Sequence, residues 1–178
     1  VRMPEQREPE PTAAIIDSQS AKGTSTTGAS GYDAGKKIKG RKRHLLVDTI
    51  GLVLVVVVHT ANVQDRDGAK LVFARAGAEC SRLQKVWADG GYAGQLVAWV
   101  QEHKQWTLEI VKRNADLTGF HVLPRRWVVE RTLAWISNCR RLSKDYEFHE
   151  STSEALVHLA MTRLMLRRLT AHRPHPAA

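Results

Sequence analysis

The sequence predicts an α/β fold in which helices flank a mixed sheet. Two β-rich runs with a turn-like tetrad between them predict a hairpin. After the hairpin, helical and extended patterns alternate, and two long helical patterns close the chain. A hairpin followed by alternating helix and strand forms a mixed sheet covered by helices, which is an α/β layer architecture.

The first half of the chain supplies the hairpin and the strand before it. An apolar run at 13–17 ends in a carboxylate and predicts a short strand, and the Ser-, Thr- and Gly-rich stretch 18–37 predicts a loop. The runs 44–47 and 52–58 flank the tetrad 48–51 and predict the hairpin. The second run has no polar alternation, so we expect it to be buried on both faces.

The second half alternates helix and strand, and its last helix opens on a capping box formed by Ser151 and Glu154. The expected elements are a helix over 65–80, a strand over 85–89, a helix over 94–103, a strand over 107–111, a loop over 114–124, a helix from about 125 to 141 and a helix over 151–169. The ribonuclease H-like fold has this order, although the order alone does not select it over other α/β folds.

Charge is the most informative property of the composition. The 178 residues carry 27 Lys and Arg against 18 Asp and Glu, a formal net charge of +9. This excess favours nucleic acid as partner over the alternative of a merely solvated basic surface. No apolar run is long enough to cross a bilayer, and no signal peptide opens the chain. Cys80 and Cys139 form no C-x-x-C pair, so we predict no zinc site and expect a cytoplasmic protein.

One folded domain is expected over residues 13–169. Residues 1–12 contain three prolines and alternating charges, which predict a linker or the cut end of a longer chain. Residues 170–178 predict a disordered tail.

Three acids, Asp17, Asp89 and Glu130, are the candidate metal ligands, and we call them the acid triad. Asp17 and Asp89 each end a short apolar strand, where ligand sites gather in open α/β sheets, and Glu130 lies beside the apolar stripe of a helix. Mg²⁺ and Mn²⁺ prefer such hard oxygen ligands, and two ions roughly 4 Å apart serve in-line phosphoryl transfer. Without a cation the three carboxylates would repel one another.

Each acid taken singly has a plainer interpretation. An Asp at a strand end is commonly a turn former or a helix cap, which suits Asp48, Asp65 and Asp67. Glu130 could belong to an ordinary i,i+4 pair with Arg126. The triad therefore depends on the sequence around each acid.

Neighbouring residues carry further expectations. Gly90 and Gly91 are expected to give the backbone room and a positive φ beside the acids. Trp127 and Trp135 are expected in the core. A tyrosine recombinase with Tyr92 as nucleophile would need a surrounding set of Arg and His that the sequence does not display.

Four motifs together resemble the DDE transposases of bacterial insertion sequences, most closely the group related to insertion sequence five. They are IIDSQS at 15–20, GYDAGKKIKGRKRHLLVD at 31–48, WADGGY at 87–92 and RRWVVERTLAW at 125–135. They occur in the family's order, and the resemblance covers about residues 13–169.

The resemblance implies a ribonuclease H-like fold, two Mg²⁺ or Mn²⁺ ions on the acid triad, and hydrolysis and strand transfer of DNA. Arg126 and Glu130 match the family's Y-x2-R-x3-E-x6-K pattern, and Arg126 joins the acids as a catalytic residue. Leu123 and Ser137 stand where the Tyr and Lys would be, so the roles of those two residues do not carry over. The implied partners are double-stranded DNA, as terminal inverted repeats and target, and a second copy on that DNA near the nucleoid.

Basic residues in three segments are the candidate DNA contacts, with a solvated loop as the alternative for the first segment. They are Lys36, Lys37, Lys39, Arg41, Lys42, Arg43, Lys112, Arg113, Arg140, Arg141 and Lys144.

Two other functions stay open at this point. The first is an inactive DNA-binding remnant, since no helix-turn-helix segment precedes the first strand. The second is a structure-selective nuclease of the same fold, which would cut DNA without strand transfer.

Overall fold

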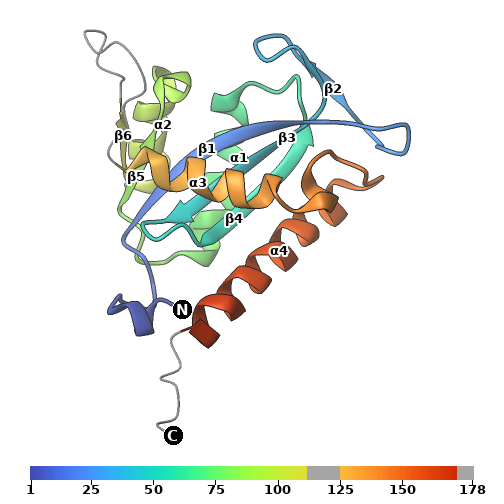
Figure 1. The fold of residues 1–178 in the computed structure, drawn as a ribbon. Helices are drawn as coiled ribbons and strands as arrows, with labels where there is room; N and C mark the ends of the chain where they lie inside the picture. The colour runs from blue at the N-terminus through green and yellow to red at the C-terminus, as the bar shows by residue number, and fades with distance from the viewer. Residues whose placement is uncertain (112–124, 172–178) are drawn as a thin grey trace, which may run out of the picture.

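The computed structural model describes residues 1–111 and 125–171, and it shows a mixed six-stranded sheet between two layers of helices (Figure 1). The strands are β1 (Ala13–Lys22), β2 (Gly31–Asp33), β3 (Ile38–Asp48), β4 (Val53–Thr60), β5 (Lys85–Ala88) and β6 (Thr107–Ile110). The sheet order is β2-β3-β1-β5-β6, and β4 also pairs with β3. The predicted mixed sheet is therefore confirmed.

Strand pairing places β1 at the junction of the antiparallel and parallel halves of the sheet. On one side β1 pairs antiparallel with β3, with Ser18 opposite His44. On the other side it pairs parallel with β5, with Ile15 opposite Trp87. The β5 and β6 strands are also parallel. The carboxyl ends of β1 and β5 thus point the same way.

Helices cover both faces of the sheet. On one face lie α1 (Asp65–Glu79) and α2 (Gln95–Lys104), and on the other lie α3 (Arg126–Ser137) and α4 (Glu150–Ala171) (Figure 1). Alternate residues of β4 serve the two layers, because Val55 and Val57 pack towards α1 while Val56 and Val58 pack towards α4. This confirms the expected burial of the Val-rich run on both faces. No helix in the described part of the chain is long and apolar enough to span a membrane.

The predicted loop over 18–37 is wrong at its start and over 31–33. Residues up to Lys22 continue β1, and residues 31–33 form β2. Their Ser, Thr and Gly content disfavours strands locally, but the register of β1 with β3 continues from Ala14–Asp48 to Lys22–Gly40. Long-range pairing therefore overrides the local preference.

Two helix ends also differ from the prediction. The Ser151–Glu154 capping box is absent, because α4 already begins at Glu150 and Glu154 bonds elsewhere. The Glu154 carboxylate accepts the Val58 N–H at 2.9 Å and pairs with Arg75 at 2.8 Å. The α3 helix ends at Ser137, and a 3₁₀ turn over Arg140–Leu142 follows it.

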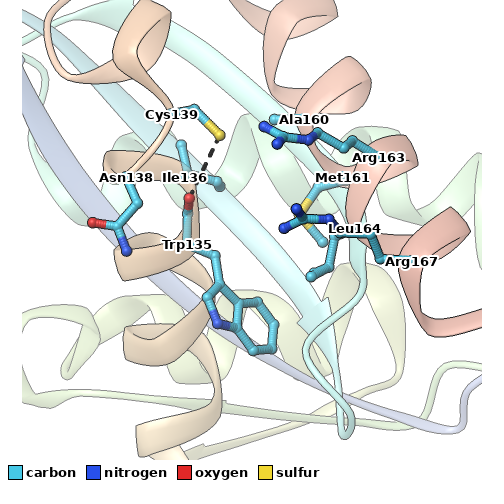
Figure 2. Close-up of a pocket in the computed structure, with 9 residues that line it drawn as sticks. All are labelled: Trp135, Ile136, Asn138, Cys139, Ala160, Met161, Arg163, Leu164 and Arg167. Atoms are coloured by element: carbon cyan, nitrogen blue, oxygen red, sulfur yellow. Dashed lines mark hydrogen bonds between the residues drawn. The ribbon is translucent and has the colours of Figure 1, made fainter. Parts of the chain in front are cut away.

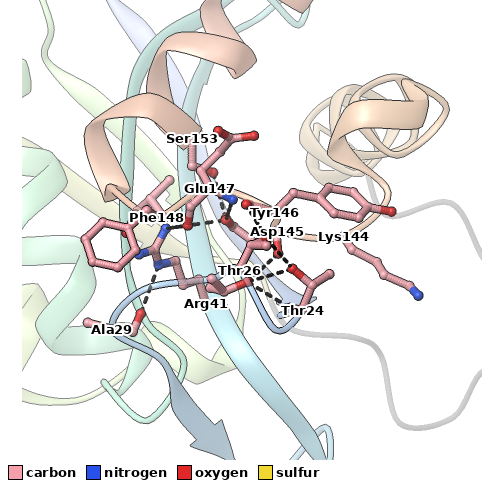
Figure 3. A network of polar contacts seen from close by, with 12 residues as sticks. Thr24, Thr26, Ala29, Arg41, Lys144, Asp145, Tyr146, Glu147, Phe148 and Ser153 are labelled. Carbon is pink, nitrogen blue, oxygen red and sulfur yellow. Dashed lines mark hydrogen bonds and ion pairs between the residues drawn. The ribbon is translucent and has the colours of Figure 1, made fainter.

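A buried cluster of polar groups fixes the segment between α3 and α4 to β3 (Figure 3). Arg41, which is 1% exposed, donates to the carbonyl oxygens of Glu147 and Phe148 and pairs with Asp145 Oδ1 at 3.4 Å. Asp145 also accepts the Ser153 hydroxyl at 2.7 Å. Because these charges are desolvated, each depends on its partners.

The packing between α3 and α4 leaves a cavity of about 330 Å³ beside Trp135 and Cys139 (Figure 2). Arg163 and Arg167 of α4 line it together with Met161. A second cavity of about 540 Å³ lies along the same helix, and it is lined by Leu159 and Leu166 among others. No acidic residue lines either cavity, so both are separate from the acid triad.

Removing the Arg41 charge should destabilise the fold. We expect Arg41→Met to lower the free energy of unfolding by about 3 kcal/mol, because Asp145 and three backbone carbonyls lose a buried donor. Urea unfolding followed by tryptophan fluorescence measures this value. Lys39→Met, on an exposed position of the same strand, is the control. A loss below about 1 kcal/mol would contradict the structural role of Arg41.

Candidate active site

The sheet register brings Asp17 and Asp89 together. Asp17 lies two residues beyond Ile15 in β1, and Asp89 lies two residues beyond Trp87, the register partner of Ile15, directly after β5. Side chains two apart on a strand share a face, so both acids project towards the layer that contains α3. The sequence predicted both acids at strand ends; this is correct for Asp89, whereas β1 continues past Asp17 to Lys22, and the register of β1 with β5 brings the two acids together.

Backbone amides orient both aspartates. Asp17 Oδ1 accepts the N–H of Ser18 at 2.7 Å. Asp89 caps a 3₁₀ turn over Gly90–Tyr92, and its Oδ1 accepts the N–H of Gly91 at 2.8 Å. In each residue one carboxylate oxygen is held and the other, Oδ2, is directed towards α3.

The α3 helix supplies Glu130 and the cation at the centre of the site. One terminal nitrogen of Arg126 lies 3.8 Å from Asp17 Oδ2 and 3.7 Å from Asp89 Oδ2. The same nitrogen lies 3.1 Å from Glu130 Oε1, four residues along the helix. The ordinary i,i+4 pair and the acid triad are thus the same cluster, because one guanidinium contacts all three acids.

Burial perturbs Asp17. Its pKa is raised to about 6, mainly by desolvation and also by the neighbouring Asp89. The Ser18 amide, Arg126 and Lys36 oppose that rise in the pKa. Asp17 is 15% exposed, whereas Glu130 is 49% exposed. A nearby cation would therefore stabilise the charged form of Asp17 most.

The donor set of the triad suits a hard divalent cation, since three carboxylates from separate elements converge there. As they stand, no three acidic, His or Cys side chains in residues 1–111 and 125–171 are spaced to hold one ion. The Arg126 guanidinium lies among the acids. A metal ion would therefore have to replace this guanidinium as their counter-charge.

Part of the predicted DNA-binding run is buried. Arg41 and Arg43 are each 1% exposed, and Arg43 donates to the carbonyl oxygens of Leu142 and Lys144. Lys42 is buried too and pairs with Asp65 at 3.0 Å. Assigning these three residues to DNA was wrong, and so was the alternative of a solvated loop, because β3 carries them into the interior.

The other predicted contact residues lie on the surface or outside the described part of the chain. Lys36, Lys37 and Lys39 are exposed, and Lys36 Nζ donates to the carbonyl oxygen of Ser18 at 3.2 Å, next to Asp17. The remaining exposed candidates are Arg140, Arg141 and Lys144. Lys112 and Arg113 lie outside the described residues, as does Leu123.

Several smaller expectations need correction. Among the described glycines, only Gly51 and Gly94 have a positive φ, so Gly90 and Gly91 do not. A side chain at Gly91 would still come within 3.0 Å of Asp89 Oδ1, so the closeness to the acid was correctly expected. Trp127 is 40% exposed instead of buried in the core, and Arg131 stacks on its ring.

Sequence reasoning missed the role of Asp65. It was expected as a helix cap, but the capping residue of α1 is Gln64, without a side-chain bond. The Asp65 carboxylate instead accepts the Ser18 hydroxyl at 2.9 Å and pairs with Lys42. In the sequence, the only indication of this contact was that a polar residue, Ser18, directly follows Asp17. At the position of the family's Lys, Ser137 accepts a hydrogen bond from Gln19.

Comparison with known proteins supports the assignment that the geometry suggests. The family described as the transposase DDE domain matches residues 8–165. The chain belongs to this family. A Burkholderia cepacia protein, described as a candidate transposase for insertion sequence element IS402, is 31% identical over 140 residues. That match covers 75% of this chain and 64% of the relative, so the DDE domain spans less than two thirds of that protein.

Solved structures show the same fold. A chain from the intasome of simian T-cell lymphotropic virus, in complex with PP2A regulatory subunit B56 gamma, aligns with a TM-score of 0.56 at 14% identity. The alignment covers 97% of this chain and 58% of that chain. The catalytic core domain of BIV integrase aligns with a TM-score of 0.45 at 12% identity, over 86% and 82% of the two chains. The first of these two alignments confirms the predicted ribonuclease H-like fold.

The raised pKa of Asp17 predicts a pH-dependent stability. The folded domain holds this proton more tightly than the unfolded chain, so stability falls as pH rises from 3.8 to about 6. The Asp17→Asn variant has no carboxyl group to ionise at this position, so it does not lose stability over this pH range. We expect the variant to match the wild type near pH 4 and to exceed it by up to about 3 kcal/mol at pH 7.

Urea unfolding at several pH values, in the presence of a chelator, measures this difference. Asp67→Asn, which removes a largely exposed carboxylate, should show a difference that does not change with pH. A pH-independent difference for Asp17→Asn as well would contradict the raised pKa.

Proposed function

We propose that this DDE domain catalyses metal-dependent hydrolysis and strand transfer of DNA in the transposition of an insertion sequence. The observation that carries the proposal is the convergence of the acid triad on one guanidinium nitrogen. The site lies just beyond the end of the parallel pairing of β1 with β5: Asp89 directly follows β5, and Asp17 lies in the part of β1 that continues past that pairing.

The acid triad would hold Mg²⁺ or Mn²⁺, and two ions are the number that we propose. When bound, such ions activate a nucleophile and stabilise the leaving oxygen of a phosphodiester. The chain itself contributes the orientation of the ligands, because the amides of Ser18 and Gly91 hold one oxygen of each aspartate. It also contributes Arg126, whose charge would be available to a phosphate if a metal ion neutralised the three acids.

Double-stranded DNA is the proposed substrate, both as the terminal inverted repeats and as the target. The net charge of +9 supports a polyanionic partner. Lys36 places a cation beside the strand that carries Asp17, and Lys37 and Lys39 are exposed nearby. We include Arg140, Arg141 and Lys144 as a second exposed group of contacts. A homodimer on DNA is part of the same proposal.

An inactive remnant is the less favoured alternative. Loss of function would remove the pressure to keep three mutually repelling carboxylates and their cation together, and here all four groups meet. The assembled site therefore favours a working enzyme over a remnant.

Cleavage by variants of the intact protein tests the proposal. With Mg²⁺ or Mn²⁺ and DNA that carries the terminal repeats, we expect Asp89→Asn to slow cleavage at least ~100-fold, because a metal ligand is lost. Asp67→Asn, an exposed acid on α1, should cleave as the wild type does. If Asp89→Asn cleaved at the wild-type rate, the assignment of the triad would be wrong. Adding unlabelled target DNA to the same reaction distinguishes strand transfer from simple cutting.

A further inference from the structure

We propose that Tyr92 is a positioning residue that sets the separation of Asp17 and Asp89 by joining the turn after Asp89 to the strands beside Asp17. This inference rests on the proposed function, because it concerns how the triad is prepared for metal ions. Three observations carry it: the place of Tyr92 in the chain, the partner of its hydroxyl group, and the register of that partner.

Tyr92 ends the short turn that Asp89 begins. Its N–H donates to the Asp89 carbonyl oxygen at 3.2 Å, so the turn is closed on itself. The side chain leaves the site and enters the core between the sheet and α1, where it is 1% exposed. The position of Asp89 thus depends on where this ring is held.

The Tyr92 hydroxyl group lies 3.3 Å from Nδ1 of His44 in the buried interior. Burial, followed by the neighbouring His59, lowers the pKa of His44 to about 3. The imidazole is therefore neutral at pH 7, and Nδ1 can accept the phenolic proton while Nε2 carries its own. That Nε2 lies 3.9 Å from Asp65 Oδ1, too far for a hydrogen bond, and is buried without a hydrogen-bond partner among the described residues.

His44 connects this bond to Asp17. In the register of β1 and β3, His44 lies opposite Ser18, the residue whose amide orients the Asp17 carboxylate. The Ser18 hydroxyl is held in turn by Asp65 at 2.9 Å. This polar network therefore lies on the face of the sheet that α1 covers. The two aspartates lie on the opposite face, each close in the sequence to a member of the network.

A purely structural role for the phenol makes a different prediction. A buried tyrosine needs a partner for its O–H wherever it lies, and losing that bond would lower stability alone. A positioning role adds an effect on the acids. Without the bond, the turn of Asp89 and the strand of Asp17 lose their common anchor, and the ligands of the ion become less organised.

The test is Mn²⁺ binding to the whole chain, measured from the electron paramagnetic resonance signal of free Mn²⁺. We expect Tyr92→Phe, which keeps the ring, to weaken binding about 10-fold. Ser153→Ala removes another buried hydroxyl bond, the one to Asp145, and should bind Mn²⁺ as the wild type does. Tyr32→Phe, on an exposed tyrosine, is the second control.

A second variant completes a double-mutant cycle. His44→Gln should weaken Mn²⁺ binding by a similar factor, and the double variant should show no further loss, because both changes remove one bond. The His44 variant also answers the question if Tyr92→Phe does not fold. Wild-type Mn²⁺ affinity in folded Tyr92→Phe, or in His44→Gln, would overturn the positioning role. Absence of Mn²⁺ binding to the wild type would instead overturn the proposed function.

Discussion

The contact between Arg126 and three carboxylates is the interaction on which the site depends. Three acids held this close repel one another, and burial of Asp17 adds a desolvation cost. The Arg126 guanidinium offsets both effects by lying within 3.8 Å of an oxygen of each acid. The three carboxylates therefore surround a positive charge. A divalent ion could bind the same three carboxylates, which the arginine holds close together.

The rest of the fold delivers the members of this cluster to one place. Parallel pairing of β1 with β5 sets Asp17 beside Asp89, and α3 crosses that face to bring Glu130 and Arg126. The β3 strand pairs with β1 on the side away from β5 and supports the arrangement there. Its buried Arg41 and Arg43 fasten the segment between α3 and α4, while its neighbouring His44 meets Tyr92. Buried polar groups thus fix the relative positions of the strands and helices that carry the acids.

Local patterns predicted the elements and the three acids, because apolar spacing and strand-end carboxylates are properties of short segments. These local patterns failed where contacts with residues distant in the sequence determine the structure. The basic residues at 41–43 look solvated in the sequence. Carbonyl groups and Asp145 more than ninety residues away help to make the burial of Arg41 and Arg43 acceptable, and Asp65 pairs with Lys42. The extension of β1 to Lys22 depends likewise on β3. Exposure of Trp127 and the link from Tyr92 to His44 required the packing of whole layers.

A crystal structure of the domain grown with Mn²⁺ would show whether the acid triad binds metal, because anomalous scattering locates the ion without assumptions. We expect manganese peaks contacted by Asp17, Asp89 and Glu130, with the Arg126 guanidinium moved away from the three acids. Manganese bound elsewhere, with Arg126 still within about 4 Å of all three carboxylates at saturating Mn²⁺, would contradict this expectation.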